Sequence, residues 1–233
     1  LLQMSEGKKE KINVLSLFDG MSCGQIALTK LGMEIENYYA SEIDKDAMFI
    51  AKKNFPNIKH IGDVTKVKGQ DLPKIDLLIG GSPCQDLSAA GKRAGINGKK
   101  SSLFFVFIEI LEHIKSLNPK VIFFQENVGS APIKDIGIMS RALGVYPARF
   151  NSELVTAQLR DRYYWTNIKT KQTMFDVVVD IPEPKDRKIM FKDILTDGYT
   201  DREKARAILE SEERLNTCLS KMHDRYKKFG NVV

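Results

Sequence analysis

Short apolar runs alternate along the chain with longer segments in which apolar residues recur at helical spacing. The segments Ile12–Leu17, Ile35–Ser41, Ile75–Ile79 and Val121–Phe124 predict buried strands. The clearest helical pattern covers Ser101–Ser116. Because strands and helices take turns, we expect an α/β protein with a doubly wound, Rossmann-like parallel sheet.

Weaker patterns complete this expectation. Further strands are predicted at Ile58–Ile61, Arg149–Val155, Arg162–Ile168 and Val177–Val179. Further helices are predicted at Gln25–Leu31, Asp44–Asn54, Lys134–Leu143 and Thr200–Glu213. From about Lys169 the chain becomes polar and weakly periodic, so we expect one domain over residues 1–168 and a small second lobe over 169–233.

The composition excludes several classes of protein. The 233 residues are 42% hydrophobic, which is enough for one sizeable core. The three cysteines and three histidines are scattered, so neither a disulfide framework nor a zinc site is expected. We find no apolar stretch of membrane-spanning length and no signal peptide in the polar amino end, which indicates a reducing compartment. The net charge of +6 permits nucleic acid without requiring it.

One cysteine follows a buried strand directly. The strand at Ile75–Ile79 ends on Gly80-Gly81, and Ser82-Pro83-Cys84 comes next. Ligands of open α/β sheets bind at the carboxyl ends of the strands, where this cysteine would lie. The alternative is a buried, inert thiol, but the polar and glycine-rich surroundings favour a nucleophile.

The turn after the first strand indicates the kind of cofactor. Its spacing, Gly20-x-x-x-Gly24, is neither the dinucleotide fingerprint nor a phosphate-binding loop. Phe18 offers a flat face, Glu42 could accept hydrogen bonds from ribose hydroxyls, and Asp63-Val64 could hold an adenine amino group. Gly24 could instead serve helix packing and Asp63 a turn cap. Together the three strand ends predict a nucleoside cofactor without phosphates, such as S-adenosylmethionine.

Two further clusters follow the later strands. Glu126-Asn127 comes after the strand at Val121, and a carboxyl in a partly apolar pocket has a raised pKa and can share a proton with a ring nitrogen. The alternative is an acidic N-cap for the next helix. Arg160 and Arg162 lie on one side of an extended segment and suit an anion or a polarised carbonyl, unless they are merely solvated.

These motifs, in this order, resemble the cytosine-5 DNA methyltransferase family. They are Phe18-x-Gly20-x-x-x-Gly24, Glu42, Asp63-Val64, Gly80-Gly-Ser-Pro-Cys84-Gln85, Glu126-Asn127-Val128 and Gln158-x-Arg160-x-Arg162. The residue sequences of these motifs are most similar to those of the de novo animal enzymes and their phage and bacterial relatives. The resemblance covers roughly Ile12 to Ile168, and its set of motifs is highly specific.

The resemblance implies the class I S-adenosylmethionine-dependent methyltransferase fold and methylation of cytosine carbon-5 in DNA. Cys84 matches the cysteine that adds to carbon-6, Glu126 the glutamate that contacts ring N3 and the exocyclic amine, and Arg160 and Arg162 the arginines that hold the carbonyl. The cofactor-binding residues implied by the motifs and their neighbours are Phe18, Asp19, Gly20, Ser22, Cys23, Gly24, Glu42, Ile43, Asp63, Val64, Ser82 and Pro83. S-adenosyl-L-homocysteine would be the product.

A base inside a duplex cannot be reached in this way, so double-stranded DNA would be bound with the target base flipped out. The segment Ser88–Lys100, which we call the basic loop, carries four cations among glycines and suits an arm that contacts phosphates. The predicted DNA-binding residues are Gln85, Ser88, Lys92, Arg93, Lys99 and Lys100.

The resemblance ends before the family's final motif, because Gly230-Asn231 is followed only by two valines. We therefore expect either an incomplete carboxyl lobe or a second chain that completes the fold. An RNA cytosine-5 methyltransferase and a non-catalytic methyltransferase-like DNA-binding subunit are the alternatives, whereas the tetrapeptide of amino-methyltransferases is absent. We expect a cytoplasmic enzyme, bacterial or phage-encoded, of the restriction-modification type rather than a nuclear one.

Overall fold

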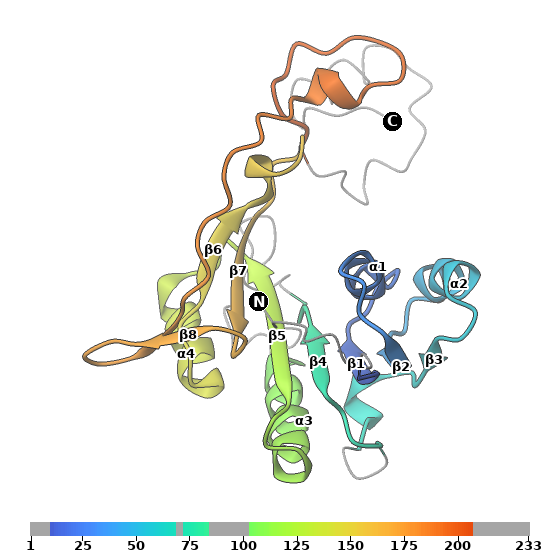
Figure 1. The fold of residues 1–233 in the computed structure, drawn as a ribbon, viewed down its shortest axis with the longest axis vertical. Helices are drawn as coiled ribbons and strands as arrows, with labels where there is room; N and C mark the ends of the chain where they lie inside the picture. Colours follow the sequence, from blue (N-terminus) through green and yellow to red (C-terminus); the bar gives the residue numbers. More distant parts are fainter. Residues whose placement is uncertain (1–9, 69–71, 84–102, 207–233) are drawn as a thin grey trace. The chain divides into compact units, whose positions relative to one another are not determined.

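The computed structural model describes residues 10–68, 72–83 and 103–206 (Figure 1). Contacts divide the chain into two compact units. The first comprises Leu1–Ala148 and Tyr163–Ile181, and the second comprises Arg149–Arg162 and Pro182–Val233. The predicted domain boundary after Ile168 stays a prediction.

A seven-stranded sheet, in the order β3-β2-β1-β4-β5-β7-β6, organises the fold. Its strands are β1 (Ile12–Leu17), β2 (Ile35–Ser41), β3 (Lys59–His60), β4 (Leu77–Gly80), β5 (Ile122–Val128), β6 (Ala148–Asn151) and β7 (Asp161–Thr166). Strands β1 to β5 pair in parallel. The strand order reverses between β1 and β4, which makes their carboxyl ends the expected place for a ligand.

Helices cover both faces of this sheet. They are α1 (Cys23–Lys30), α2 (Lys45–Asn54), α3 (Leu103–Leu117) and α4 (Ile133–Leu143). Neighbouring residues of β1 point to opposite faces. Val14 packs in a cluster with Leu28 of α1 and Ala51 of α2, whereas Leu15 packs in the cluster that contains residues of α3 and α4. The predicted doubly wound α/β architecture is therefore confirmed.

The elements predicted between residues 12 and 143 are present with ends shifted by a few residues. One later prediction is wrong over the described residues, because residues 200–206 form no helix. There the backbone of Ala205 donates to Ala157 O at 2.7 Å and accepts from Leu159 N at 2.8 Å. These strand-like bonds occupy backbone groups that a helix would need, and no apolar stripe favours the helix.

The strand predicted at Arg149–Val155 ends early, at Asn151. Its side chain accepts from the Glu153 backbone at 3.3 Å and starts a 3-10 turn, Ser152–Leu154. Two further 3-10 turns (Val64–Lys66 and Phe191–Ile194) and the small strand β8 (Thr170–Gln172), which pairs with β9 (Val177–Val179), were not predicted as elements. Among the described residues, no helix has the length and apolar character that a bilayer crossing requires.

Candidate active site

The turn after β1 has an unusual backbone that two hydrogen bonds stabilise. Phe18, Gly20 and Ser22 have φ of 57°, 59° and 62°. The Ser22 hydroxyl donates to the Asp19 carboxylate, and the Tyr38 hydroxyl donates to Asp19 Oδ1 at 2.7 Å. Burial, together with the Asp19 charge, raises the pKa of Tyr38 well above its usual range, so the phenol stays neutral. Asp19 therefore holds the turn in shape from inside.

Gly24 serves close packing between helix and strand, as the alternative interpretation proposed. A β-carbon there would lie 3.0 Å from the Tyr38 hydroxyl and 3.2 Å from Ile79 Cδ1. Cys23, by contrast, is exposed at the first position of α1. A β-carbon at Gly20 would meet no atom within 4 Å, so the turn faces open space at that point.

Glu42 links the ends of β1 and β2. Its Oε2 accepts from the Gly20 N–H at 2.8 Å, and its Oε1 accepts from the Ile43 and Asp44 N–H groups at 2.7 and 2.9 Å. Each carboxylate oxygen has two acceptor sites, so Oε2 keeps one site for a hydroxyl donor. Ile43 follows with 73% of its surface exposed, which leaves an apolar side chain next to the carboxylate.

Asp63 caps the turn at Val64–Lys66, as the alternative to a ligand contact predicted. Its Oδ1 accepts from the Thr65 backbone and hydroxyl, both at 2.9 Å, and these bonds lower the pKa of Asp63. Val64 is only 6% exposed and belongs to the core, against which Phe18 packs. A ligand could thus reach the Asp63 carboxylate more readily than Val64.

The ends of β4 and β5 are joined by side chains. Ser82 Oγ accepts from Gln125 Nε2 at 3.0 Å and from Asn127 Nδ2 at 3.3 Å, and all three residues are buried. A β-carbon at Gly81 would lie 3.2 Å from Glu126 Oε2. The backbone leading to Pro83 and Cys84 therefore lies directly against the strand that carries Glu126.

Glu126 does not cap the following helix. It lies inside β5, and the N-cap of α4 is Pro132. The alternative interpretation of this glutamate is therefore wrong, because the strand continues through Val128.

Arg160 and Arg162 belong to the second unit by contacts. The Arg160 N–H donates to Asn151 Oδ1 at 2.9 Å, and Arg162 Nη1 donates to the Asp161 carbonyl at 2.8 Å. Arg160 precedes β7 and Arg162 lies in it, so the expected spacing of two residues on an extended segment is present. Their predicted contact with a cytosine carbonyl stays a prediction.

Several predicted site residues lie outside the described residues. They are Cys84, Gln85, Ser88, Lys92, Arg93, Lys99 and Lys100. Pro83 is the last described residue before them.

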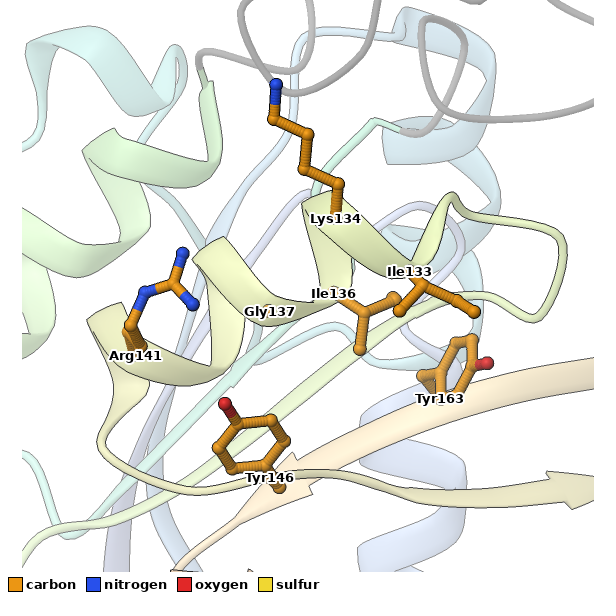
Figure 2. A pocket seen from close by; sticks show the side chains of 7 residues that line it. All are labelled: Ile133, Lys134, Ile136, Gly137, Arg141, Tyr146 and Tyr163. Carbon is orange, nitrogen blue, oxygen red and sulfur yellow. The ribbon is translucent and has the colours of Figure 1, made fainter. Parts of the chain in front are cut away.

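A shallow hollow of about 440 Å³ lies elsewhere in the first unit (Figure 2). Its walls are formed by Ile133, Lys134, Ile136, Gly137, Arg141, Tyr146 and Tyr163. Figure 2 shows the two tyrosines beside α4 and Lys134 pointing away from them. None of the predicted site residues lines this hollow, so it has no part in the predicted chemistry.

Two residues of the site escaped sequence reasoning. Tyr38 supports the cofactor turn, and Gln125 joins two strand ends. Gln125 could have been singled out from the sequence, since it is a polar residue directly after the apolar run Val121–Phe124. No feature of the sequence distinguishes Tyr38, because aromatic residues are common in strands.

The parallel sheet, its switch point and the ligand-suited turn define the class I S-adenosylmethionine-dependent methyltransferase fold. Solved structures agree: the chain matches Spodoptera frugiperda DNMT2 with a TM-score of 0.54, 21% identity, and coverage of 75% of this chain and 56% of that one. S. pombe Dnmt2 matches with a TM-score of 0.51, 19% identity and coverage of 70% and 52%. The family model "C-5 cytosine-specific DNA methylase" matches residues 12–136. The chain belongs to this family.

Phage and bacterial relatives are named as methyltransferases. The orphan methyltransferase M.SPRI of Bacillus phage SPR is 37% identical over 171 residues, which cover 68% of this chain and 38% of that protein. The type II methyltransferase M1.ScrFI of Lactococcus lactis subsp. cremoris is 32% identical over 209 residues, which cover 84% of this chain and 51% of that protein. The chain thus spans about half or less of the length of these relatives. Methyltransferases of this family and fold use S-adenosylmethionine in general.

Proposed function

We propose that this chain is the catalytic part of an enzyme that methylates carbon-5 of cytosine in double-stranded DNA. One observation carries the proposal: Ser82, two residues before Cys84, is hydrogen-bonded to the residues on both sides of Glu126. A nucleophile and a carboxyl group that act on one flat base must be close together, and this contact joins the segments that carry them. Membership of the family and the phage and bacterial relatives support the same conclusion.

The residues at the cofactor end fit an adenosine. Glu42 keeps one acceptor site for a ribose hydroxyl, Ile43 exposes apolar surface beside it, and Gly20 opens onto free space. Asp63 presents an exposed carboxylate at the next strand end. When bound, S-adenosylmethionine supplies the methyl group. Asp19 and Ser22 hold the shape of this turn through their hydrogen bond, and contact of Phe18, Asp19, Ser22, Gly24 and Val64 with the cofactor stays a prediction.

At the other end, the Cys84 thiolate donates its electron pair to carbon-6 of the flipped base, and the ring electrons move toward carbon-5. Glu126 holds ring N3 and the exocyclic amine, where charge gathers as the thiolate adds. Arg160 and Arg162 hold the carbonyl oxygen. After carbon-5 has gained the methyl group, a water-derived base removes the proton from carbon-5. The bond between carbon-6 and the Cys84 sulfur then breaks and restores the thiolate. Splitting one hard step into easier ones is the gain of covalent catalysis.

The test is transfer of labelled methyl from S-adenosylmethionine by the full chain, with duplex DNA and tRNA as competing acceptors. We expect label on DNA cytosine with the wild type. Cys84→Ser should transfer no methyl group, because its hydroxyl is a far weaker nucleophile than a thiolate. This variant should still bind the cofactor. Label on tRNA alone would indicate the RNA enzyme. DNA binding without transfer to either acceptor would indicate the non-catalytic subunit.

A further inference from the structure

Gln125 places a polar amide side chain at a fully buried position of strand β5. It follows the apolar residues Phe123 and Phe124 in β5, and none of its surface is exposed. A buried amide is unfavourable unless its polar atoms are hydrogen-bonded, and an apolar side chain would fill the space without that penalty. Packing alone therefore does not explain this residue.

The amide group makes two bonds that connect different segments. Nε2 donates to Ser82 Oγ at 3.0 Å and to the Glu126 carbonyl at 3.2 Å. Ser82 precedes Pro83 and Cys84 in the chain, and it is 5% exposed. The Gln125 amide thus connects the backbone of Glu126 to the segment that directly precedes Cys84.

The neighbouring strand is adapted to this side chain. Gly80 of β4 lies opposite Gln125 in the parallel register. A β-carbon at Gly80 would lie 3.0 Å from Gln125 Oε1 and 2.7 Å from the ring of Phe107, which is fully buried. A β-carbon at position 80 would crowd both the Phe107 ring and the amide oxygen, so Gly80 leaves room for these two side chains.

We propose that Gln125 is a positioning residue for methyl transfer, which fixes the spacing between the Cys84 segment and Glu126 through its bond to Ser82. The proposal rests on the proposed function, because it assigns Gln125 to that same site. Gln125 itself touches no reacting atom. Its effect is on geometry, so its loss slows the chemical step and leaves cofactor binding intact.

The test uses the full chain with Gln125→Met, Ser82→Ala and the double variant. Gln125→Met keeps the volume of the side chain and removes both donors. The matched control is Asn118→Leu, because Asn118 is a buried amide at the opposite end of the strands, where its Nδ2 donates to Ile75 O at 2.8 Å. This control removes a similar hydrogen bond far from the site.

Single-turnover methyl transfer and calorimetry give the first readout. We expect Gln125→Met and Ser82→Ala to lower the rate of methyl transfer at least tenfold. In Gln125→Met the Kd of S-adenosylmethionine should change less than twofold. The rate loss in the double variant should be smaller than the product of the two single losses, because both variants remove the bond between Gln125 and Ser82. A rate for Gln125→Met within twofold of wild type, or a tenfold loss in Asn118→Leu, would overturn the proposal.

Hydrogen exchange gives a readout that needs no activity. The peptide that begins at Gly80 should exchange faster in both site variants than in wild type and in Asn118→Leu. Unchanged exchange in the site variants would overturn the proposed link even if the enzyme is active. If wild type transfers no methyl to cytosine, the proposed function fails while this exchange experiment still decides whether Gln125 fixes the segment.

Discussion

Replacing Glu42 tests the cofactor end of the site most sharply. Its carboxylate accepts three backbone N–H groups at 2.7 to 2.9 Å and, in our proposal, a ribose hydroxyl as well. Hydrogen bonds to a charged group contribute about 1.5–3 kcal/mol. Glu42→Ala should therefore weaken binding of S-adenosylmethionine roughly 10- to 150-fold, since about 1.4 kcal/mol corresponds to a tenfold change. Glu42→Gln, which keeps one oxygen acceptor, should lose less.

Loss of the backbone bonds also lowers stability, so the assay needs a control that loses stability alone. Asp44 provides it, because its Oδ1 caps α2 by accepting from Asp46 N and Ala47 N at 2.8 and 3.0 Å. Asp44→Ala should lower the free energy of unfolding by about 1 kcal/mol and leave the cofactor Kd unchanged. Urea unfolding measures the stability of each variant, and titration calorimetry on the folded proteins measures the Kd. A Kd for Glu42→Ala within twofold of that for Asp44→Ala would refute the reasoning.

Three further results are expected. Gly80→Ala should lower the free energy of unfolding by roughly 1–3 kcal/mol, because its β-carbon meets the Phe107 ring at 2.7 Å. Gly137→Ala in α4 should not lower it. Urea unfolding measures both variants, and equal stabilities would contradict this expectation. Tyr38→Phe should lose about 1 kcal/mol at pH 8. Because folding raises the pKa of Tyr38, the wild type should lose stability as pH rises above about 10. The difference in the free energy of unfolding between the wild type and Tyr38→Phe should therefore become smaller above that pH. A difference that stays constant with pH would count against the bond to Asp19. Neutralising the four cations of the basic loop should flatten the salt dependence of DNA affinity, and an unchanged slope in filter binding would contradict its role.

The sheet was predictable because its signals are local. Strands β1, β2, β4 and β5 are apolar or alternating segments, each followed within two residues by a small or acidic residue. Asp44 caps α2 as its side chain predicts. The failure at Thr200–Glu213 has a different origin. The backbone of Ala205 pairs with Ala157 and Leu159, which lie 48 and 46 residues earlier in the chain, and no local pattern encodes such a pairing.

The candidate site was predicted in its parts but not in its connections. Glu42 and Glu126 could be named from their places at strand ends. That Glu42 also accepts the Gly20 N–H, and that Gln125 reaches Ser82, depends on which strands are neighbours and on their register. The structure also tests two alternative interpretations. Asp63 does cap a turn, which leaves its contact with the cofactor a prediction, and Glu126 does not cap a helix.

The most direct test of the central claim is bisulfite sequencing of DNA from cells that express the gene, compared with cells that express its Cys84→Ser variant. Bisulfite distinguishes carbon-5-methylated cytosine from unmodified cytosine at every position. We predict protected cytosines within a recurring sequence in the wild type and none above background in the variant. Absence of protection in both, or equal protection in both, would contradict a Cys84-dependent cytosine-5 DNA methyltransferase.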